Sequence, residues 1–190
     1  MVQHLTWRDS LTLRRMNAKR PPLKLDIQRA ASTAWQDSGR DTLATYPRLM
    51  HDTKGRGEEN LLDWSVRLTS RMGVDGRHEP WMWLSVSVDL PLDCQRCLGV
   101  VDVHVVVDRA FRFVDTEALA AAQDEAAPED VLVVDHEFDL ACLIEDEVLL
   151  ASPLAPSHAD CPMAVPSGCG ADEGATHPFD VLAHWKDQLD

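Results

Sequence analysis

The sequence predicts a single α+β domain, in which a mainly antiparallel sheet of about five strands carries a few packed helices. Residues 82–92 and 101–113 place an apolar side chain at nearly every second position, as strands with one buried face do. The short link between these two runs predicts an antiparallel hairpin. A third alternating run covers residues 61–72, whereas residues 139–150 repeat their apolar positions with helical spacing.

The first half of the chain and the segment after the hairpin hold less regular patterns. Residues 22–27 alternate like a short edge strand, and a helix is expected around residues 28–35, with a break at Gly39. Residues 51–60 contain two glycines and paired glutamates, which predict a loop. The segment 115–130 is rich in Ala, Asp and Glu, which suits an acidic loop or linker, or alternatively a frayed acidic helix.

The last part of the chain is predicted to contain two helices. A short buried strand at residues 131–134 is followed by Asp139, which can cap the helix over residues 139–150. Pro153 ends that helix because proline cannot continue the hydrogen-bond ladder. Pro178 suits the first turn of a C-terminal helix with a short apolar face.

Charge is distributed unevenly along the chain. The net charge is −14, yet residues 1–24 carry six basic side chains against one acidic side chain. We expect residues 1–21 to form a disordered basic extension, with a nucleic-acid-contacting arm as the alternative, and residues 22–190 to form the domain. An acidic domain repels a phosphate backbone, so a basic protein partner suits it better than non-specific RNA, and no DNA binding is expected.

Composition also argues against a membrane or secreted protein. No run of about 18 apolar residues is available to cross a bilayer. The N-terminal residues lack the apolar stretch of a secretion signal. The chain has five cysteines, an odd number that does not suggest a disulfide framework, so we expect a reducing, cytoplasmic setting.

Two cysteines flank the tip of the predicted hairpin. The residues between them, Gln95 and Arg96, lack the chemistry of a tight turn, so something else is expected to hold the tip. A hairpin tip aims two sulfurs the same way, which suits half of a tetrahedral zinc site. A redox dithiol is disfavoured because a strand follows, not a helix N-terminus, and unligated thiols are the other interpretation. The expected zinc ligands are Cys94, Cys97, Cys161 and Cys169, with His158 as an alternative ligand.

An acidic run and two tryptophans are candidate binding residues. Glu145, Asp146 and Glu147 occupy consecutive helix positions, which diverge too much to converge on one reacting atom. We expect an exposed acidic patch there, with partner binding as its possible role. Trp81 and Trp83 lie on the polar side of their strand, where packing under a helix is expected and stacking on a ligand is the alternative.

No catalytic constellation is evident in the sequence. His104 lies among valines on a strand and is expected to pack or to pair across the sheet, while Cys142 is expected in the core. The chain has no phosphate-binding glycine loop and no HExxH pattern. A protein without enzymatic activity is therefore predicted. The alternatives are a zinc- or dithiol-dependent enzyme that uses the hairpin cysteines, and a small-molecule binding module that uses the two tryptophans.

Three stretches together resemble a known family. The first is CQRCL at residues 94–98, directly after an alternating strand. The second extends from Asp139 to Cys161 and contains the acidic run, and the third is PFDVL at residues 178–182. In this order and spacing they closely resemble the bacterial YceD family, the large ribosomal RNA subunit accumulation proteins, over roughly residues 22–185.

This resemblance implies a cellular role and the kinds of partner, and it implies no catalytic residues. It implies a cytoplasmic factor in the synthesis, processing or stability of large-subunit ribosomal RNA. Its partners would be the ribosomal RNA precursor or a basic ribosomal or assembly protein. Some family members carry extra cysteines in the segment that follows the positions of His158 and Cys161. This chain has Cys161 and Cys169 but no compact CxxC there. A structural zinc ion therefore remains a prediction from the cysteines.

Overall fold

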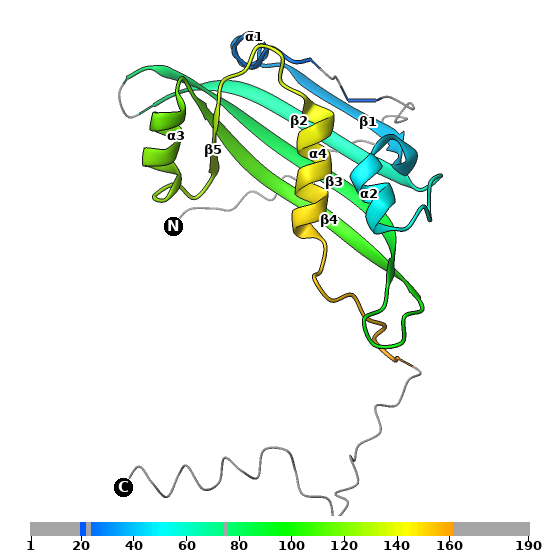
Figure 1. Cartoon of the computed structure of the whole chain (residues 1–190). Coiled ribbons are helices and arrows are strands. Elements are labelled where there is room, and N and C mark those ends of the chain that lie inside the picture. The colour runs from blue at the N-terminus through cyan, green and yellow to red at the C-terminus, as the bar shows by residue number, and fades with distance from the viewer. Residues whose placement is uncertain (1–19, 22–23, 74–75, 162–190) are drawn as a thin grey trace, which may run out of the picture. The chain divides into compact units, whose positions relative to one another are not determined.

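A five-stranded sheet forms the centre of the computed structural model, which describes residues 20–21, 24–73 and 76–161 (Figure 1). The strand order follows the chain, β1-β2-β3-β4-β5. The first four strands pair antiparallel, and β5 runs parallel to β4. The predicted α+β fold is thus confirmed. The strands are β1 (Gln36–Thr42), β2 (Leu61–Met72), β3 (His78–Asp93), β4 (Val100–Val114) and β5 (Asp130–Val133).

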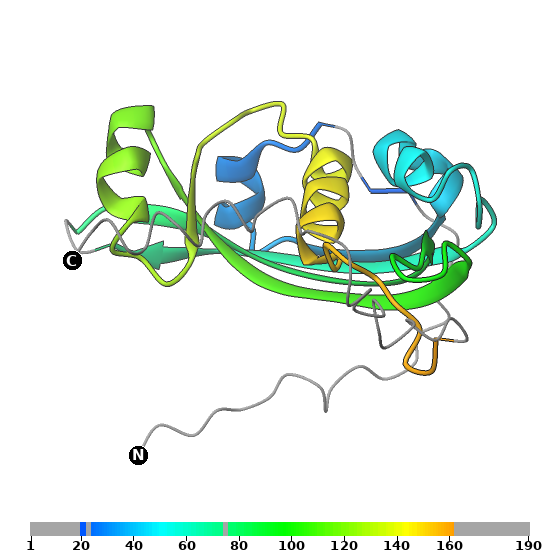
Figure 2. The ribbon, with the colours of Figure 1, turned by 60° about the horizontal axis from the view of Figure 1, so that its bottom comes forward.

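Helices α1, α2 and α4 lie on one face of this sheet (Figure 2). On that face, Trp64 and Leu84 of the sheet share a buried core with Ile144 and Val148 of α4. Side chains alternate along a strand, so their sequence neighbours point to the opposite face, called the outer face below. No helix among the described residues is long and apolar enough to cross a membrane. The helices are α1 (Ile27–Ser32), the short 3₁₀ helix η2 (Leu43–Thr45), α2 (Pro47–Asp52), α3 (Glu117–Asp124) and α4 (Leu140–Ala151).

The central hairpin and the long helix match the sequence predictions closely. Strands β3 and β4 pair without a break from Trp81 with Arg112 to Asp93 with Val100. The carboxylate of Asp139 accepts a hydrogen bond from the backbone N–H of Cys142 at 3.0 Å, which caps α4 as expected. The alternating run 61–72 forms β2, and the short strand expected at 131–134 is β5.

Several predictions for the first half are wrong. Gly39 does not break a helix but lies inside β1, where it pairs with Trp64. Pairing with β2 overrides the local preference of glycine. Helix α1 already begins at Ile27, so the described residues 24–27 form no strand, and an isolated bridge joins Leu25 to Phe138. The expected helix also ends at Ser32 and does not reach residue 35.

The acidic segment 115–130 is described by the structure, whereas the predictions for the two ends of the chain are not tested. The segment 115–130 contains helix α3, in which the side chain of Thr116 accepts a hydrogen bond from Leu119. This is the helical alternative, and α3 packs against β5 around a small core of Val114, Ala120 and Val131. The C-terminal helix expected from Pro178, and nearly all of the basic extension expected at residues 1–21, lie outside the described residues.

Candidate metal centre

The tip of the β3–β4 hairpin is a tight turn that starts at Cys94. The N–H of Cys94 donates to the carbonyl of Gly99, and the N–H of Leu98 donates to the carbonyl of Cys94, both at 2.8 Å. Leu98 has a positive φ of 59° and its side chain is 77% exposed. A left-handed conformation costs a non-glycine residue roughly 1–2 kcal/mol, so the tip is held against local preference.

The sulfur of Cys94 lies where backbone N–H groups converge. Cys94 is completely buried, and burial alone raises the pKa of its thiol. Hydrogen bonds from the backbone N–H groups of Cys97, His158 and Arg96 outweigh burial and lower the pKa of Cys94 to about 5. Cys94 is therefore a thiolate at neutral pH, which is the form that binds metal ions.

The imidazole of His158 faces the hairpin sulfurs through one ring nitrogen. Its Nδ1 lies 3.4 Å from the Sγ of Cys97, and its Nε2 donates to the carbonyl of Val100 at 2.8 Å. That hydrogen bond to Val100, followed by the one with Cys94, raises the pKa of His158. A carbonyl can only accept, so the bond fixes the ring with Nδ1 towards the sulfurs. Metal-binding histidines use their second nitrogen in this way.

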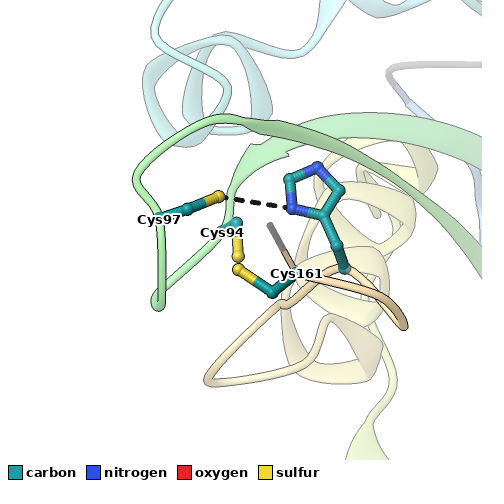
Figure 3. Close-up of side chains that lie close together, drawn as sticks. Cys94, Cys97 and Cys161 are labelled. Carbon is teal, nitrogen blue, oxygen red and sulfur yellow. Dashed lines mark hydrogen bonds between the residues drawn. The ribbon is translucent and has the colours of Figure 1, made fainter. Parts of the chain in front are cut away.

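Four side chains thus meet around the hairpin tip. The ligand atoms of Cys94, Cys97, His158 and Cys161 all lie within 4.8 Å of one another, and this group could hold a metal ion (Figure 3). Three thiolates and one imidazole are an ordinary ligand set for zinc. Cys169, which the sequence predicted as a ligand, lies outside the described residues. Cys161, predicted as a ligand, and His158, predicted as the alternative ligand, both lie in this group.

The hairpin tip is fixed to its surroundings on both sides. The N–H of Gln95 donates to the carbonyl of Pro156 at 2.8 Å, which links the tip to the segment after α4. Asp93, at the end of β3, forms ion pairs with Lys54 and with Arg56, the latter at 2.7 Å. Hydrogen bonds from Lys54 and Arg56 lower the pKa of Asp93, so its carboxylate remains ionised. The cysteine positions are therefore held by the fold around them.

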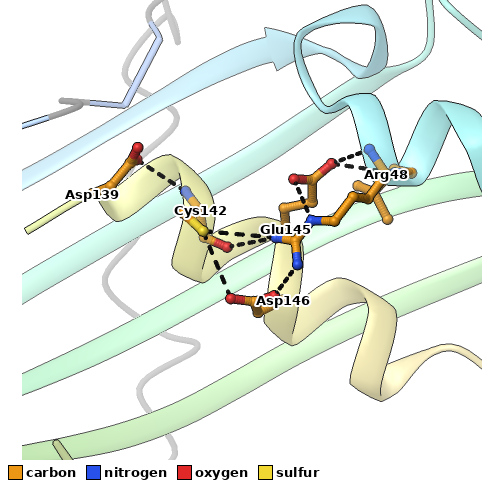
Figure 4. Close-up of polar contacts among 6 residues, drawn as sticks. Arg48, Asp139, Cys142, Glu145 and Asp146 are labelled. Atoms are coloured by element: carbon orange, nitrogen blue, oxygen red, sulfur yellow. Dashed lines mark hydrogen bonds and ion pairs between the residues drawn. The ribbon is translucent and has the colours of Figure 1, made fainter.

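The acidic run on α4 is mostly internal, which corrects the prediction of an exposed patch. Glu145 is 6% exposed, and its carboxylate accepts hydrogen bonds from the backbone N–H groups of Arg48 at 2.6 Å and Leu49 at 3.2 Å (Figure 4). The guanidinium of Arg48 also pairs with Glu145 at 2.9 Å and with Asp146. Sequence alone could not indicate this burial because Arg48 lies 97 residues from Glu145.

The other two members of the acidic run, Asp146 and Glu147, differ in exposure. Glu147 is 6% exposed and lies 3.9 Å from the guanidinium of Arg109. Asp146 keeps 45% of its side chain exposed, so it is the member that a partner could reach. Cys142, predicted in the core, is exposed beside Arg48 and Asp146. Partner binding by Glu145, Asp146 and Glu147 stays a prediction.

The outer face of the sheet carries the two tryptophans. Trp81 and Trp83 alternate with core residues of β3, so they lie on the outer face and are partly exposed, and packing under a helix stays a prediction. Arg67 and Arg71 of β2 lie beside them, a pairing that sequence reasoning missed. On the same face, Asp89 pairs with His104 of β4 at 2.7 Å, which matches the cross-strand pairing expected for that histidine.

The fold and the site define an α+β sheet protein whose longest hairpin ends in a candidate metal knuckle. A family model described as "Large ribosomal RNA subunit accumulation protein YceD" matches residues 82–186, and the chain belongs to this family. The matched region begins in β3 and contains β4, α4 and all four candidate ligands. Searches of curated proteins and of solved structures found no match.

Proposed function

We propose that this protein is a non-enzymatic, cytoplasmic factor in the synthesis, processing or stability of large-subunit ribosomal RNA. The family match over residues 82–186 carries this proposal, because the family description names the accumulation of that RNA. The matched residues include the hairpin and the four side chains that could hold a metal ion. A structural metal site would account for the positions of these four side chains without any enzymatic reaction.

The proposal assigns two kinds of partner. The net charge of −14 favours a basic ribosomal or assembly protein. Asp146 is the accessible member of the acidic run and is the residue that would contact such a partner, while Glu145 and Glu147 would support its helix. Contact with the ribosomal RNA precursor is the second mode, and it requires a local cationic surface on an acidic body.

The proposal also assigns a structural zinc ion to Cys94, Cys97, His158 and Cys161. In this ligand set His158 takes the position that the sequence analysis gave to Cys169. Four protein ligands leave no open coordination position, which suits a structural role better than a catalytic one. Bound there, the ion would join the hairpin tip to the segment after α4.

Deletion or depletion of the gene tests the ribosomal role. The expected result is a fall in large-subunit ribosomal RNA relative to small-subunit ribosomal RNA, measured on total RNA, with recovery when the gene is restored. An unchanged ratio would overturn the proposed function. Restoration with Cys142→Ser, which lies outside the metal cluster, serves as the matched control for restoration with Cys94→Ser.

The enzyme alternative makes a different prediction for the cysteines. If Cys94 and Cys97 performed chemistry, alanine at both positions would abolish function in a protein that still folds. A structural site would lose stability together with its metal. Measuring the unfolding transition of the Cys94→Ala/Cys97→Ala variant beside its ability to restore the RNA ratio separates the two roles.

A further inference from the structure

Trp81 and Trp83 form an aromatic pair on the outer face of the sheet. Their ring centroids are 6.0 Å apart and their planes differ by 20°, so the rings stack along β3. Both side chains are partly exposed, although neighbouring positions of the strand are buried. Two large aromatic rings on this face add nothing to the core between the sheet and α4.

Two guanidinium groups extend this pair into a row. The Cζ of Arg67 lies 4.8 Å from the ring centroid of Trp83. The Cζ of Arg71 lies 4.9 Å from the ring of Trp81 and 4.3 Å from the ring of Trp83. At these distances each cation interacts with the ring face. Four side chains from two neighbouring strands therefore make one aromatic and cationic surface.

The charge of Arg71 is available to a ligand. Within residues 20–21, 24–73 and 76–161, Arg71 forms no ion pair, and it is exposed. The carboxylate opposite it across the strands, Glu79, instead lies 3.5 Å from the guanidinium of Arg112. Arg112 is further paired with Glu129 at 2.7 Å. Glu79 and Glu129 thus both contact Arg112, while the guanidinium of Arg71 stays exposed beside Trp81.

We propose that Trp81, Trp83, Arg67 and Arg71 form a binding surface for single-stranded RNA. This inference rests on the proposed function and specifies how an acidic protein would contact ribosomal RNA precursor. Unpaired bases would stack on the indole rings or guanidinium planes, and the phosphates between them would interact with the arginine charges. Successive outward positions of a strand are about 7 Å apart, so the two rings can serve neighbouring bases.

Chemistry favours this ligand over the alternatives. A basic protein would be repelled by the two arginines, although it suits the rest of the chain. A duplex hides its base faces, so it could meet only the arginines and not the tryptophans. A free nucleobase or another flat metabolite could use the rings alone, but it would leave the arginines without a phosphate.

The test is binding of purified full-length protein to a labelled single-stranded RNA about 12 nucleotides long, followed by fluorescence anisotropy. The wild-type protein should bind it more tightly than the same sequence as a duplex. Trp81→Ala/Trp83→Ala should weaken binding at least about tenfold, given the usual loss for each stacked base. Arg71→Ala should reduce the salt dependence of log Kd by about 0.7, the value for one phosphate contact on a single strand.

Matched variants separate this surface from general charge and from folding. Arg29→Ala removes the same charge from exposed α1, on the helix side of the sheet, and should leave affinity unchanged within about twofold. Arg71→Glu keeps both tryptophans and should still weaken binding, so the inference does not depend on the double tryptophan variant folding. Equal binding of single strand and duplex would overturn it. So would wild-type affinity in both the tryptophan and the Arg71 variants.

Failure of this inference is distinguishable from failure of the proposed function. The RNA surface is tested on purified protein, whereas the ribosomal role is tested by the RNA ratio in depleted cells. If the ratio falls on depletion but purified protein ignores single-stranded RNA, the surface assignment is wrong and the role stands. If binding behaves as predicted but depletion leaves the ratio unchanged, the surface stands and the ribosomal role is wrong.

Discussion

Glu145 on α4 caps the start of α2 from another part of the chain. Its Oε1 accepts the backbone N–H groups of Arg48 at 2.6 Å and Leu49 at 3.2 Å, and its Oε2 accepts the Arg48 guanidinium at 2.9 Å. Pro47 occupies the first turn of α2 and has no N–H to offer. A buried carboxylate therefore satisfies the free donors of a helix that has no side-chain cap of its own.

Removal of the Glu145 carboxylate should destabilise the fold. Glu145→Ala leaves two buried or partly buried N–H groups and a guanidinium without their acceptor, so a loss of about 3 kcal/mol in the free energy of unfolding is expected. Urea denaturation followed by circular dichroism measures it. Asp146→Ala is the matched control, since its ion pair with Arg48 is half exposed and should contribute under about 1 kcal/mol. Equal losses in both variants would contradict the capping role.

Protein purified without chelator should contain one zinc ion per chain. Mass spectrometry of metal content is the measurement, and Cys161→Ser should lose the ion because it removes one of four ligands. Cys142→Ser should keep it, since Cys142 lies exposed on α4 and away from the cluster. Full zinc occupancy in Cys161→Ser would show that another residue completes the site.

Replacement of Leu98 by glycine should stabilise the protein. The backbone at Leu98 has φ 59° and its side chain is 77% exposed, so glycine removes strain and loses little packing. The expected gain in the free energy of unfolding is about 1 kcal/mol. Arg96→Gly at the same tip is the control, because Arg96 is not in a left-handed conformation and glycine there should give no gain. The prediction fails if Leu98→Gly lowers the unfolding midpoint.

Glu147 should make stability fall as pH rises above the ordinary range of a glutamate. Burial raises the pKa of Glu147, and Arg109 opposes this effect only in part. The folded state therefore holds its proton more tightly than the unfolded state, so ionisation costs stability above the unfolded pKa. Glu147→Gln should unfold at higher urea concentration than wild type at pH 7, with the difference shrinking below about pH 4.

A control variant and one contrary result test this prediction of pH dependence. Glu117→Gln changes an exposed glutamate at the start of α3 and should not reproduce the pH-dependent difference. If Glu147→Gln were less stable than wild type at pH 7, its contact with Arg109 at 3.9 Å would outweigh the cost of burial.

The parts of the fold that the sequence predicted are those with strong local periodicity. The alternation in β2, β3 and β4 and the helical spacing of α4 identified these elements before any contacts were known. Strand β1, with the sequence QDSGRDT, has no apolar alternation and contains Gly39, so only its pairing with β2 makes it a strand. Local preference does not contain that information.

The residues of the candidate site were predictable from their types, since Cys94, Cys97 and Cys161 were expected as ligands and His158 as an alternative, but the contact between its two parts was not. Cys94 and Cys97 lie on one hairpin tip, so their proximity follows from the turn itself. His158 approaches Cys97 across 61 residues of chain, and sequence spacing does not determine such a contact. The outer-face pairing of Arg71 with Trp81 likewise depends on the register between β2 and β3, which no pattern within either strand specifies.

The contact between Cys97 and His158 has a consequence for the unfolded chain. The two residues are 61 positions apart, and β4, α3, β5 and α4 all lie between them. An ion that bound both would act as a cross-link around this whole segment and would lower the entropy of the unfolded state. The chain-entropy relation for a loop of this length gives about 4 kcal/mol. The free energy needed to unfold the continuous segment from β4 to α4 would then depend on the concentration of the metal ion.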